Sequence, residues 1–279
     1  MTNNLPKIIY GTAWKKEATR DLVVTAVLQG FRAIDTACQP KHYREDLVGE
    51  ALQVLYDQHG FKREDLWIQT KFTPIGGQDT TQPLPYDPSH PIHSQIRTSL
   101  STSLKNLRTT YLDSLILHSP LSTFEETKVA WKELCRIRDE GVVRAIGLSN
   151  TYDVDVVRKL STGEEGRGVG VVQNRWYERN GWDKDVAGYC RENGIMYQSF
   201  WTLTGSPRLL QHASVLTLAR ELNCTPEQIV YRIAQINGVT PLAGSTNKEH
   251  MKDGVEVKDI DLANCKGSGH AETLRNLLF

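Results

Sequence analysis

The chain has 279 residues, which is long enough for two ordinary domains or for one large α/β barrel. Its 33 basic and 33 acidic residues cancel, which removes the long-range field that would attract nucleic acid or an anionic membrane. No apolar stretch approaches the roughly 20 residues that span a bilayer, and the first residues lack the apolar core of a secretory signal. We therefore expect a cytoplasmic protein that binds a small molecule.

After a short strand at residues 7–10, apolar β-branched runs alternate with amphipathic stretches along the chain. Strands are expected at 31–36, 66–72, 114–119, 142–148, 169–175, 195–200 and 239–244. Helices are expected at 17–29, 44–57, 92–108, 123–140, 152–161, 183–193, 208–222 and 225–237. Repeated strand–helix units predict a parallel sheet. Their number is enough for a closed (β/α)8 TIM barrel, formed by residues 1–279 as a single domain.

A long segment at 73–93, rich in proline and glycine, interrupts this alternation without dividing the chain into domains. Long loops inside a compact domain are usually functional or mobile. Because this one directly follows Lys71, we expect it to overhang the active site. A surface excursion without a role is the alternative.

Three polar side chains end three successive apolar runs: Asp35, Lys71 and His118. In a barrel of parallel strands the carboxyl ends share one rim, and reactive residues there come from several strands. The sequence therefore predicts that an acid, a base and an imidazole meet at this rim.

The cysteines and histidines favour neither disulfides nor a metal site. The cysteines are odd in number and contain no C-x-x-C pair: Cys38, Cys135, Cys190, Cys224 and Cys265. His90 and His93 form an H-x-x-H pair in the long loop, but no third ligand accompanies them. We expect reduced thiols and no metal.

The residues around the strand ends resemble the signature of the aldo-keto reductase family. The matching stretches are 34–37, Tyr43 with Glu45, 48–51, 70–71, 112–120, 146–150 and Gln173. The resemblance covers nearly the whole chain and implies an enzyme that reduces aldehydes or ketones with a nicotinamide cofactor. Nine positions run from Asp35 to Tyr43 inclusive, a longer loop than in most members, and this resembles fungal-type reductases.

The resemblance implies a catalytic set of Asp35, Tyr43, Lys71 and His118. Hydride delivered to a carbonyl carbon leaves charge on oxygen, which a positioned acid must quench, and Tyr43 is the candidate. A phenol titrates near 10 in water, so Lys71 is expected to lower the pKa of Tyr43. Asp35 would orient Lys71, and His118 would hold the substrate oxygen.

The resemblance also implies where the cofactor lies. The nicotinamide would meet Ser149, Asn150 and Gln173 and stack on Phe200, with Trp201 as the alternative ring and Leu203 nearby. Its phosphates would meet a helix N-terminus at Gly244, Ser245, Thr246, Asn247, Lys248 and His250. His250 stands where the family usually carries arginine, and a glycine stands where a lysine is common. NADPH is favoured, and NADH is possible.

A run of glycines at Gly163, Gly166, Gly168 and Gly170 precedes a strand instead of following one. A dinucleotide-binding fingerprint needs the opposite order, so this run is interpreted as a flexible connection.

Two tryptophans are expected to line the substrate pocket, Trp14 after the first strand and Trp176 after a later one. Aromatic side chains at the pocket entrance suit a carbonyl compound that is apolar or partly apolar. The protein is expected to be a monomer or a weak homodimer. Two other functions remain open. One is a cofactor-binding regulatory or sensor module with little turnover, and the other is a non-redox isomerase or lyase that uses Lys71.

Overall fold

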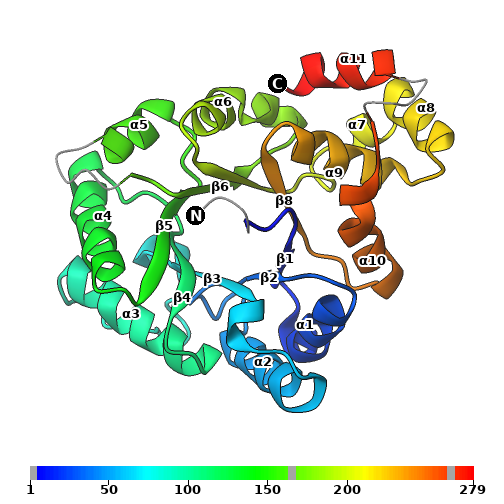
Figure 1. Ribbon diagram of the computed structural model, residues 1–279. Coiled ribbons are helices and arrows are strands. Elements are labelled where there is room, and N and C mark those ends of the chain that lie inside the picture. Colours follow the sequence, from blue (N-terminus) through cyan, green and yellow to red (C-terminus); the bar gives the residue numbers. More distant parts are fainter. Residues whose placement is uncertain (1–4, 163–167, 263–267) are drawn as a thin grey trace.

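The computed structural model describes residues 5–162, 168–262 and 268–279, which form a closed barrel of parallel strands inside a ring of helices (Figure 1). The strands follow one another around the barrel in chain order, and the last pairs with the first. They are β1 (Ile9–Gly11), β2 (Ala33–Asp35), β3 (Trp67–Phe72), β4 (Leu112–Leu117), β5 (Val143–Ser149), β6 (Val171–Arg175), β7 (Met196–Phe200) and β8 (Val239–Ala243). The predicted (β/α)8 barrel is confirmed.

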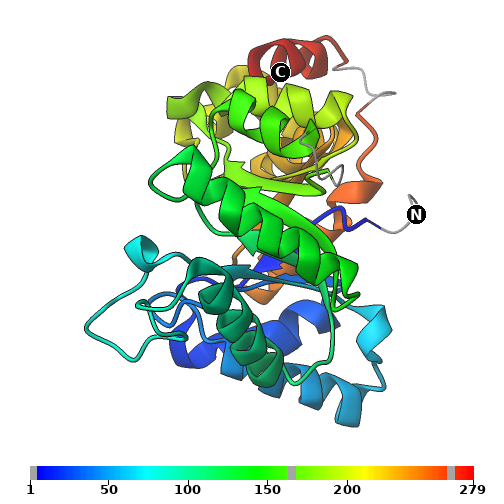
Figure 2. The same cartoon turned by 90° about the vertical axis from the view of Figure 1, so that its left-hand side faces the viewer.

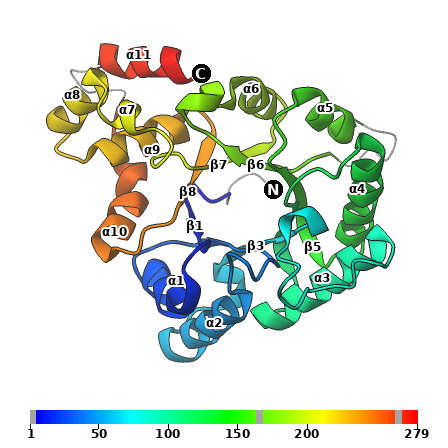
Figure 3. The same ribbon diagram turned by 180° about the vertical axis from the view of Figure 1, so that it is seen from behind.

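The helices lie outside the strands, as the two views along the barrel from opposite sides show (Figures 1 and 3). They are α1 (Thr19–Leu28), α2 (Glu45–His59), α3 (Ile92–Leu107), α4 (Phe124–Asp139), α5 (Val154–Thr162), α6 (Lys184–Glu192), α7 (Pro207–Leu210), α8 (Ala213–Glu221), α9 (Pro226–Ile236), α10 (Lys248–Glu256) and α11 (Ser268–Leu278). Short 3-10 turns occur at η1 (Lys16–Ala18), η2 (Arg63–Asp65), η3 (Ile75–Gly77), η4 (Glu178–Asp183) and η5 (Val257–Asp259). In the part of the chain that the structure describes, no helix is long and apolar enough to cross a membrane.

One predicted helix, at 208–222, is divided into α7 and α8. The break falls at His212, whose backbone is extended and whose Nδ1 accepts a hydrogen bond from the Ser214 backbone N–H. A side chain that satisfies a free amide in this way begins a new helix. The expectation of one continuous helix was therefore wrong.

Local caps explain several other boundaries. The Thr123 hydroxyl accepts a hydrogen bond from the Glu126 backbone, and the Glu126 carboxylate accepts one from the Thr123 backbone, so α4 begins with a capping box. Thr225 and Gln228 form the same pair at the start of α9, where Pro226 occupies the first turn. At the end of α2, Gly60 adopts a left-handed conformation with φ of 72°.

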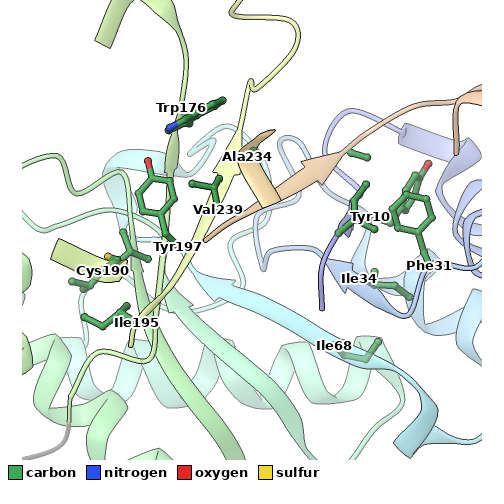
Figure 4. Close-up of a cluster of buried hydrophobic side chains, with 14 of the residues drawn as sticks. Tyr10, Phe31, Ile34, Ile68, Trp176, Cys190, Ile195, Tyr197, Ala234 and Val239 are labelled. Carbon is green, nitrogen blue, oxygen red and sulfur yellow. The ribbon is translucent and has the colours of Figure 1, made fainter. Parts of the chain in front are cut away.

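The main core lies between the outer face of the strands and the helices. Figure 4 shows part of it, with Tyr197 near Cys190 in one region and Tyr10 near Phe31 and Ile34 in another. A second, smaller cluster uses strand positions of the opposite parity and fills the barrel itself: Ile9, Ala33, Ile116, Val171 and Met196. Side chains alternate between the two faces of a strand, so each strand contributes to both clusters.

The segment between β3 and α3 extends along one side of the molecule (Figure 2). It is anchored by Tyr86, whose hydroxyl donates to the Thr73 carbonyl at 2.7 Å, and by Gln78, whose amide donates to the Cys38 carbonyl at 3.0 Å. Tyr86 and Gln78 are both buried. The segment is therefore packed against the barrel through specific contacts.

Two sequence features fall partly outside the described residues. Gly163 and Gly166 of the glycine run do so, and so does Cys265. Within the described residues Cys38, Cys190 and Cys224 are free thiols.

The contact between α2 and α3 generates a test of the packing. A Cβ at Gly49 would overlap the backbone carbonyl of Asn106, so Gly49→Ala should lower the free energy of unfolding by about 1–3 kcal/mol, as measured by urea denaturation. Gly188→Ala on α6 is the matched control, because nothing lies within 4 Å of its Cβ position. Equal stability of the two variants would contradict this account of the helix contact.

Candidate active site

The four predicted catalytic residues come together at the carboxyl end of the barrel. Asp35 is the last residue of β2, Lys71 lies near the end of β3, and His118 directly follows β4. Tyr43 enters from the loop before α2, with its ring centroid 5.1 Å from Lys71 Nζ and 6.0 Å from the His118 ring. The structure thus places the four side chains in one cluster.

A buried ion pair lies at the base of this cluster. Lys71 Nζ donates to Asp35 Oδ2 at 2.6 Å and to the Thr36 carbonyl at 2.9 Å. The side chains of Lys71 and Asp35 are both buried. Burial alone would lower the pKa of Lys71, but the Asp35 carboxylate and the Tyr43 phenol outweigh it and raise that pKa. Lys71 is therefore a fixed cation beneath Tyr43.

Tyr43 differs from expectation in one respect. Burial raises the pKa of its phenol, Lys71 pulls that pKa down, and Asp35 raises it again, so the pKa lies above its ordinary value. The sequence predicted the direction of the Lys71 effect, but the expected net lowering is wrong because the phenol is buried. The phenol consequently holds its proton at neutral pH.

His118 is held as a neutral imidazole. Burial, the Lys71 cation and the nearby His42 ring lower the pKa of His118 well below its usual value. Its Nδ1 lies 2.7 Å from the Thr73 hydroxyl. When this hydroxyl donates to Nδ1, the ring proton resides on Nε2, which is then a hydrogen-bond donor.

A layer of buried amides lies below the ion pair, and two of its members, Gln69 and Gln198, were missed by the sequence analysis. Asp35 Oδ1 accepts from Gln69 Nε2 at 2.7 Å and from Gln173 Nε2 at 2.9 Å. Both glutamines also donate to Gln198 Oε1. The available signal was a glutamine two positions before Lys71 and another two before Phe200, because this spacing places side chains on the same face of a strand.

These contacts give Gln173 a defined orientation. Its Nε2 is committed to Asp35 and Gln198, while Gln173 itself lines the cavity. The Oε1 atom is then the part of this amide that remains as an acceptor for a bound molecule.

Three residues of the cluster, Asp35, Tyr43 and His118, line a cavity of about 750 Å³, a size typical of sites for small molecules and cofactors. One end is bounded by Trp14, His42, Tyr43 and His118. From there the cavity continues past the ends of β5, β6 and β7 to α9 and α10. The predicted cofactor residues on its surface are Ser149, Asn150, Gln173, Phe200, Trp201, Leu203, Gly244, Ser245 and His250.

Only part of the 244–250 segment, which was expected to bind the cofactor phosphates, faces the cavity. Thr246, Asn247 and Lys248 do not line the cavity. Asn247 caps α10, and its Oδ1 accepts from the backbone N–H groups of Glu249 and His250. Those two amides are thus already satisfied, which corrects the expectation that the first turn of α10 is free to hold an anion.

A lysine that the sequence analysis did not select lies beside Gly244, a residue of the cavity wall, although Lys15 itself does not line the cavity. Lys15 donates from Nζ to the Gly244 carbonyl, and this Nζ is 3.6 Å from the Cβ position at Gly244. Burial lowers the pKa of Lys15. A cation from the β1–α1 connection therefore lies beside the glycine of β8–α10.

Of the two expected pocket tryptophans, the structure places one at the cavity. Trp14 is 66% exposed at the rim, and its ring stacks on His42 with 3.6 Å between centroids. Trp176 is fully buried and packs against Trp182 and Phe279. The expectation that Trp176 lines the pocket is therefore wrong. Side chains alternate between the two faces of a strand, so Gln173 and Arg175 face the cavity and Trp176 faces the helices.

None of the residues in the 73–93 segment lines the cavity, so its expected position over the active site stays a prediction. It lies behind the catalytic cluster, where Thr73 contacts His118. Gln39 adds a further link by donating to the Gly77 carbonyl at 2.5 Å. The segment supports the cluster from the side away from the cavity.

Comparisons with known proteins agree with this geometry. The model of the Aldo/keto reductase family matches residues 7–264. An uncharacterized oxidoreductase of Bacillus subtilis, YtbE, is 28% identical, with 86% of this chain and 78% of that protein covered. The methylglyoxal reductase DkgB of Escherichia coli O157:H7 is 27% identical, with 89% and 85% covered.

Solved structures show the same fold. An aldo-keto reductase of the silkworm, Bombyx mori, has a TM-score of 0.81 at 21% identity, covering 99% of this chain and 85% of that one. An aldo-keto reductase complexed with NADPH has a TM-score of 0.80 at 20% identity, with 99% and 85% covered. Since the family model spans nearly the whole length and the closed barrel carries the four expected side chains at its rim, the chain belongs to the aldo/keto reductase family.

Proposed function

We propose that this chain reduces an aldehyde or ketone to an alcohol with NADPH and uses Tyr43 as the general acid. The observation that carries the proposal is the position of the Tyr43 phenol above the buried Lys71–Asp35 pair, beside the His118 imidazole, on the wall of the cavity. NADPH would supply a hydride to the carbonyl carbon. The protein must then neutralise the charge that develops on the carbonyl oxygen.

The proton is proposed to come from the Tyr43 hydroxyl. Burial keeps this proton in place at neutral pH, and the carbonyl oxygen becomes a much stronger base as it gains charge. Lys71 stabilises the phenolate that remains, because its ammonium is fixed by Asp35 and Thr36. The Nε2–H of His118 would hold the carbonyl oxygen within reach of Tyr43.

The cavity has groups suited to a nicotinamide. Gln173 presents an acceptor oxygen and Ser149 lines the same wall. Asn150 also lines this wall, with its amide bonded to the His118 carbonyl and to Arg175. The Phe200 ring lies at the end of β7, with its centroid 5.3 Å from the Arg175 guanidinium carbon. Carboxamide binding needs such donors and acceptors, and stacking needs only an aromatic face. These residues fit the ring, and the NADPH complex of a structurally similar aldo-keto reductase supports the same choice of cofactor.

The opposite end of the cavity is proposed to hold phosphate. Ser245 and His250 line this end, and Lys15, which does not itself line the cavity, places a cation beside the lining residue Gly244. A cation that is partly buried interacts with phosphate more strongly than one in bulk solvent. Lys15 thus contributes positive charge where the segment after β8 lacks an arginine or lysine facing the cavity.

The isomerase or lyase alternative is disfavoured by the state of Lys71. An imine-forming lysine or a lysine base must be neutral and accessible. Lys71 is fully buried, does not line the cavity and has a raised pKa. A cofactor-binding sensor with little turnover would have the same binding groups, and measuring carbonyl reduction distinguishes it from a reductase.

Replacing Tyr43 by Phe should lower kcat by about 10²–10⁴-fold, because the acid is lost while the ring shape remains. NADPH affinity, measured by quenching of protein fluorescence, should change little. Tyr189→Phe is the matched control, since Tyr189 lies on α6 away from the cavity. Turnover that survives in Tyr43→Phe would mean that the acid is wrongly assigned, and His118 would be the next candidate.

Lys15→Met should raise the Kd for NADPH by roughly 10-fold, the usual scale for losing a hydrogen bond to a charged group. The exposed neighbour Lys16→Met controls for the loss of one positive charge. Parallel titration with NADH shows which phosphate Lys15 contacts. An equal loss of affinity for both cofactors indicates the diphosphate, and a loss of affinity for NADPH alone indicates the additional phosphate of NADPH. Unchanged affinity for both would remove Lys15 from the cofactor site.

A further inference from the structure

One cation in the cavity is not used by the chemistry proposed above. Arg175 is the last residue of β6 and lines the cavity together with Tyr43 and His118. Its guanidinium carbon lies 5.3 Å from the centroid of the Phe200 ring and 4.7 Å from that of Trp201. The two rings hold the guanidinium at the wall of the cavity.

The charge of Arg175 is not neutralised by the protein. Among the residues that the structure describes, Arg175 forms no ion pair with a carboxylate. Asp35 is committed to Lys71. The other cavity carboxylates, Glu227 and Asp253, belong to α9 and α10, beside His250. Arg175 is therefore an uncompensated positive charge near the catalytic end.

The donor groups of Arg175 are also only partly used. Its Nη1 donates to Asn150 Oδ1 at 3.1 Å and lies 3.4 Å from the Tyr152 hydroxyl. For Nε and Nη2, the described part of the chain supplies no hydrogen-bond partner. These two nitrogens form one edge of the guanidinium, and such an edge matches the two oxygens of a carboxylate.

A short chain of hydrogen bonds connects the Nη1 atom of Arg175 to the backbone carbonyl of His118. Asn150 Nδ2 donates to the His118 carbonyl at 2.8 Å, and Asn150 Oδ1 accepts from Arg175. A molecule whose carbonyl oxygen meets Tyr43 and His118 therefore has Arg175 on the neighbouring wall. The phosphate end, with Lys15 and Ser245, is built by other strands, β1 and β8.

We propose that Arg175 is a specificity-determining residue that selects carbonyl substrates carrying a carboxylate. The inference rests on the proposed reductase function and names the substrate class of the same site. The carbonyl oxygen binds between Tyr43 and His118, and the carboxylate accepts two hydrogen bonds from Nε and Nη2 of Arg175. The exposed rings of Trp14 and Trp201 at the rim accommodate the apolar part between these two groups.

The test uses pairs of substrates that differ only in charge. The purified full-length chain with saturating NADPH is assayed on 4-carboxybenzaldehyde and methyl 4-formylbenzoate, and on 4-oxobutanoate and its methyl ester. The quantity compared is the ratio of kcat/KM for the acid to kcat/KM for the ester. We expect this ratio to be about 10 or more for at least one pair.

Arg175→Gln should lower the acid-to-ester ratio by about 10–100-fold, since it removes a charged bidentate donor. Arg175→Lys should retain part of the preference, because it keeps the charge without the fork. Arg179→Gln is the matched control. Arg179 lines a neighbouring hollow outside the catalytic cavity, so this variant should keep the wild-type ratio.

Other outcomes overturn the inference and are distinguishable from failure of the proposed function. If acids and esters are reduced equally by the wild type, or if Arg175→Gln leaves the ratio unchanged, Arg175 does not select substrates although the reductase stands. If Arg175→Gln weakens NADPH binding and lowers both substrates equally, its role is to position Asn150. If no carbonyl compound in either pair or among neutral aldehydes is reduced, the proposed function itself fails.

Discussion

The ion pair between Lys71 and Asp35 is the interaction on which the active site depends. Two charges inside a barrel lose their hydration, and their attraction offsets this cost only when the remaining hydrogen-bonding capacity is satisfied. Here Asp35 also accepts from Gln69 and Gln173, while Lys71 also donates to the Thr36 carbonyl. An apolar pair of similar volume would often be as stable, so a functional reason for the charges is the more economical explanation.

That reason is found in the residues above the pair. Lys71 stabilises the phenolate form of Tyr43, and with burial it keeps His118 neutral. The buried glutamines extend the same network to Gln173, whose orientation on the cavity wall follows from its bond to Asp35. The proposed proton donor, the imidazole proposed to bind the carbonyl and the proposed nicotinamide-binding amide are thus coupled through the Lys71–Asp35 pair.

The charges of the cavity are divided along its length. Lys71 and Asp35 compensate each other below the catalytic end, Arg175 is uncompensated on the adjacent wall, and Lys15 lies at the end formed by β1 and β8. Two separate cations provide two places for anionic groups. In the proposed arrangement, the cofactor phosphates and a substrate carboxylate are therefore bound by residues of different strands.

Much of this arrangement was predictable from the sequence. The alternation of apolar runs and amphipathic stretches predicted the barrel, because period-2 and period-3.6 patterns are local properties of the chain. The order of Asp35, Lys71 and His118 at strand ends predicted their convergence, because parallel strands of a closed barrel share one rim. The position of Tyr43 followed from the family resemblance.

Only the tertiary structure decided the contacts between residues distant in sequence. The approach of Lys15 to Gly244, the free edge of Arg175 and the burial of Trp176 depend on which neighbours surround each side chain. The net shift in the pKa of Tyr43 also depends on the tertiary structure. Burial opposes the effect of Lys71, and a sequence does not specify burial in detail. The sequence by itself thus determined the barrel and the identity of its reactive rim. The tertiary structure determined how charge and desolvation balance there, because both depend on distances across the fold.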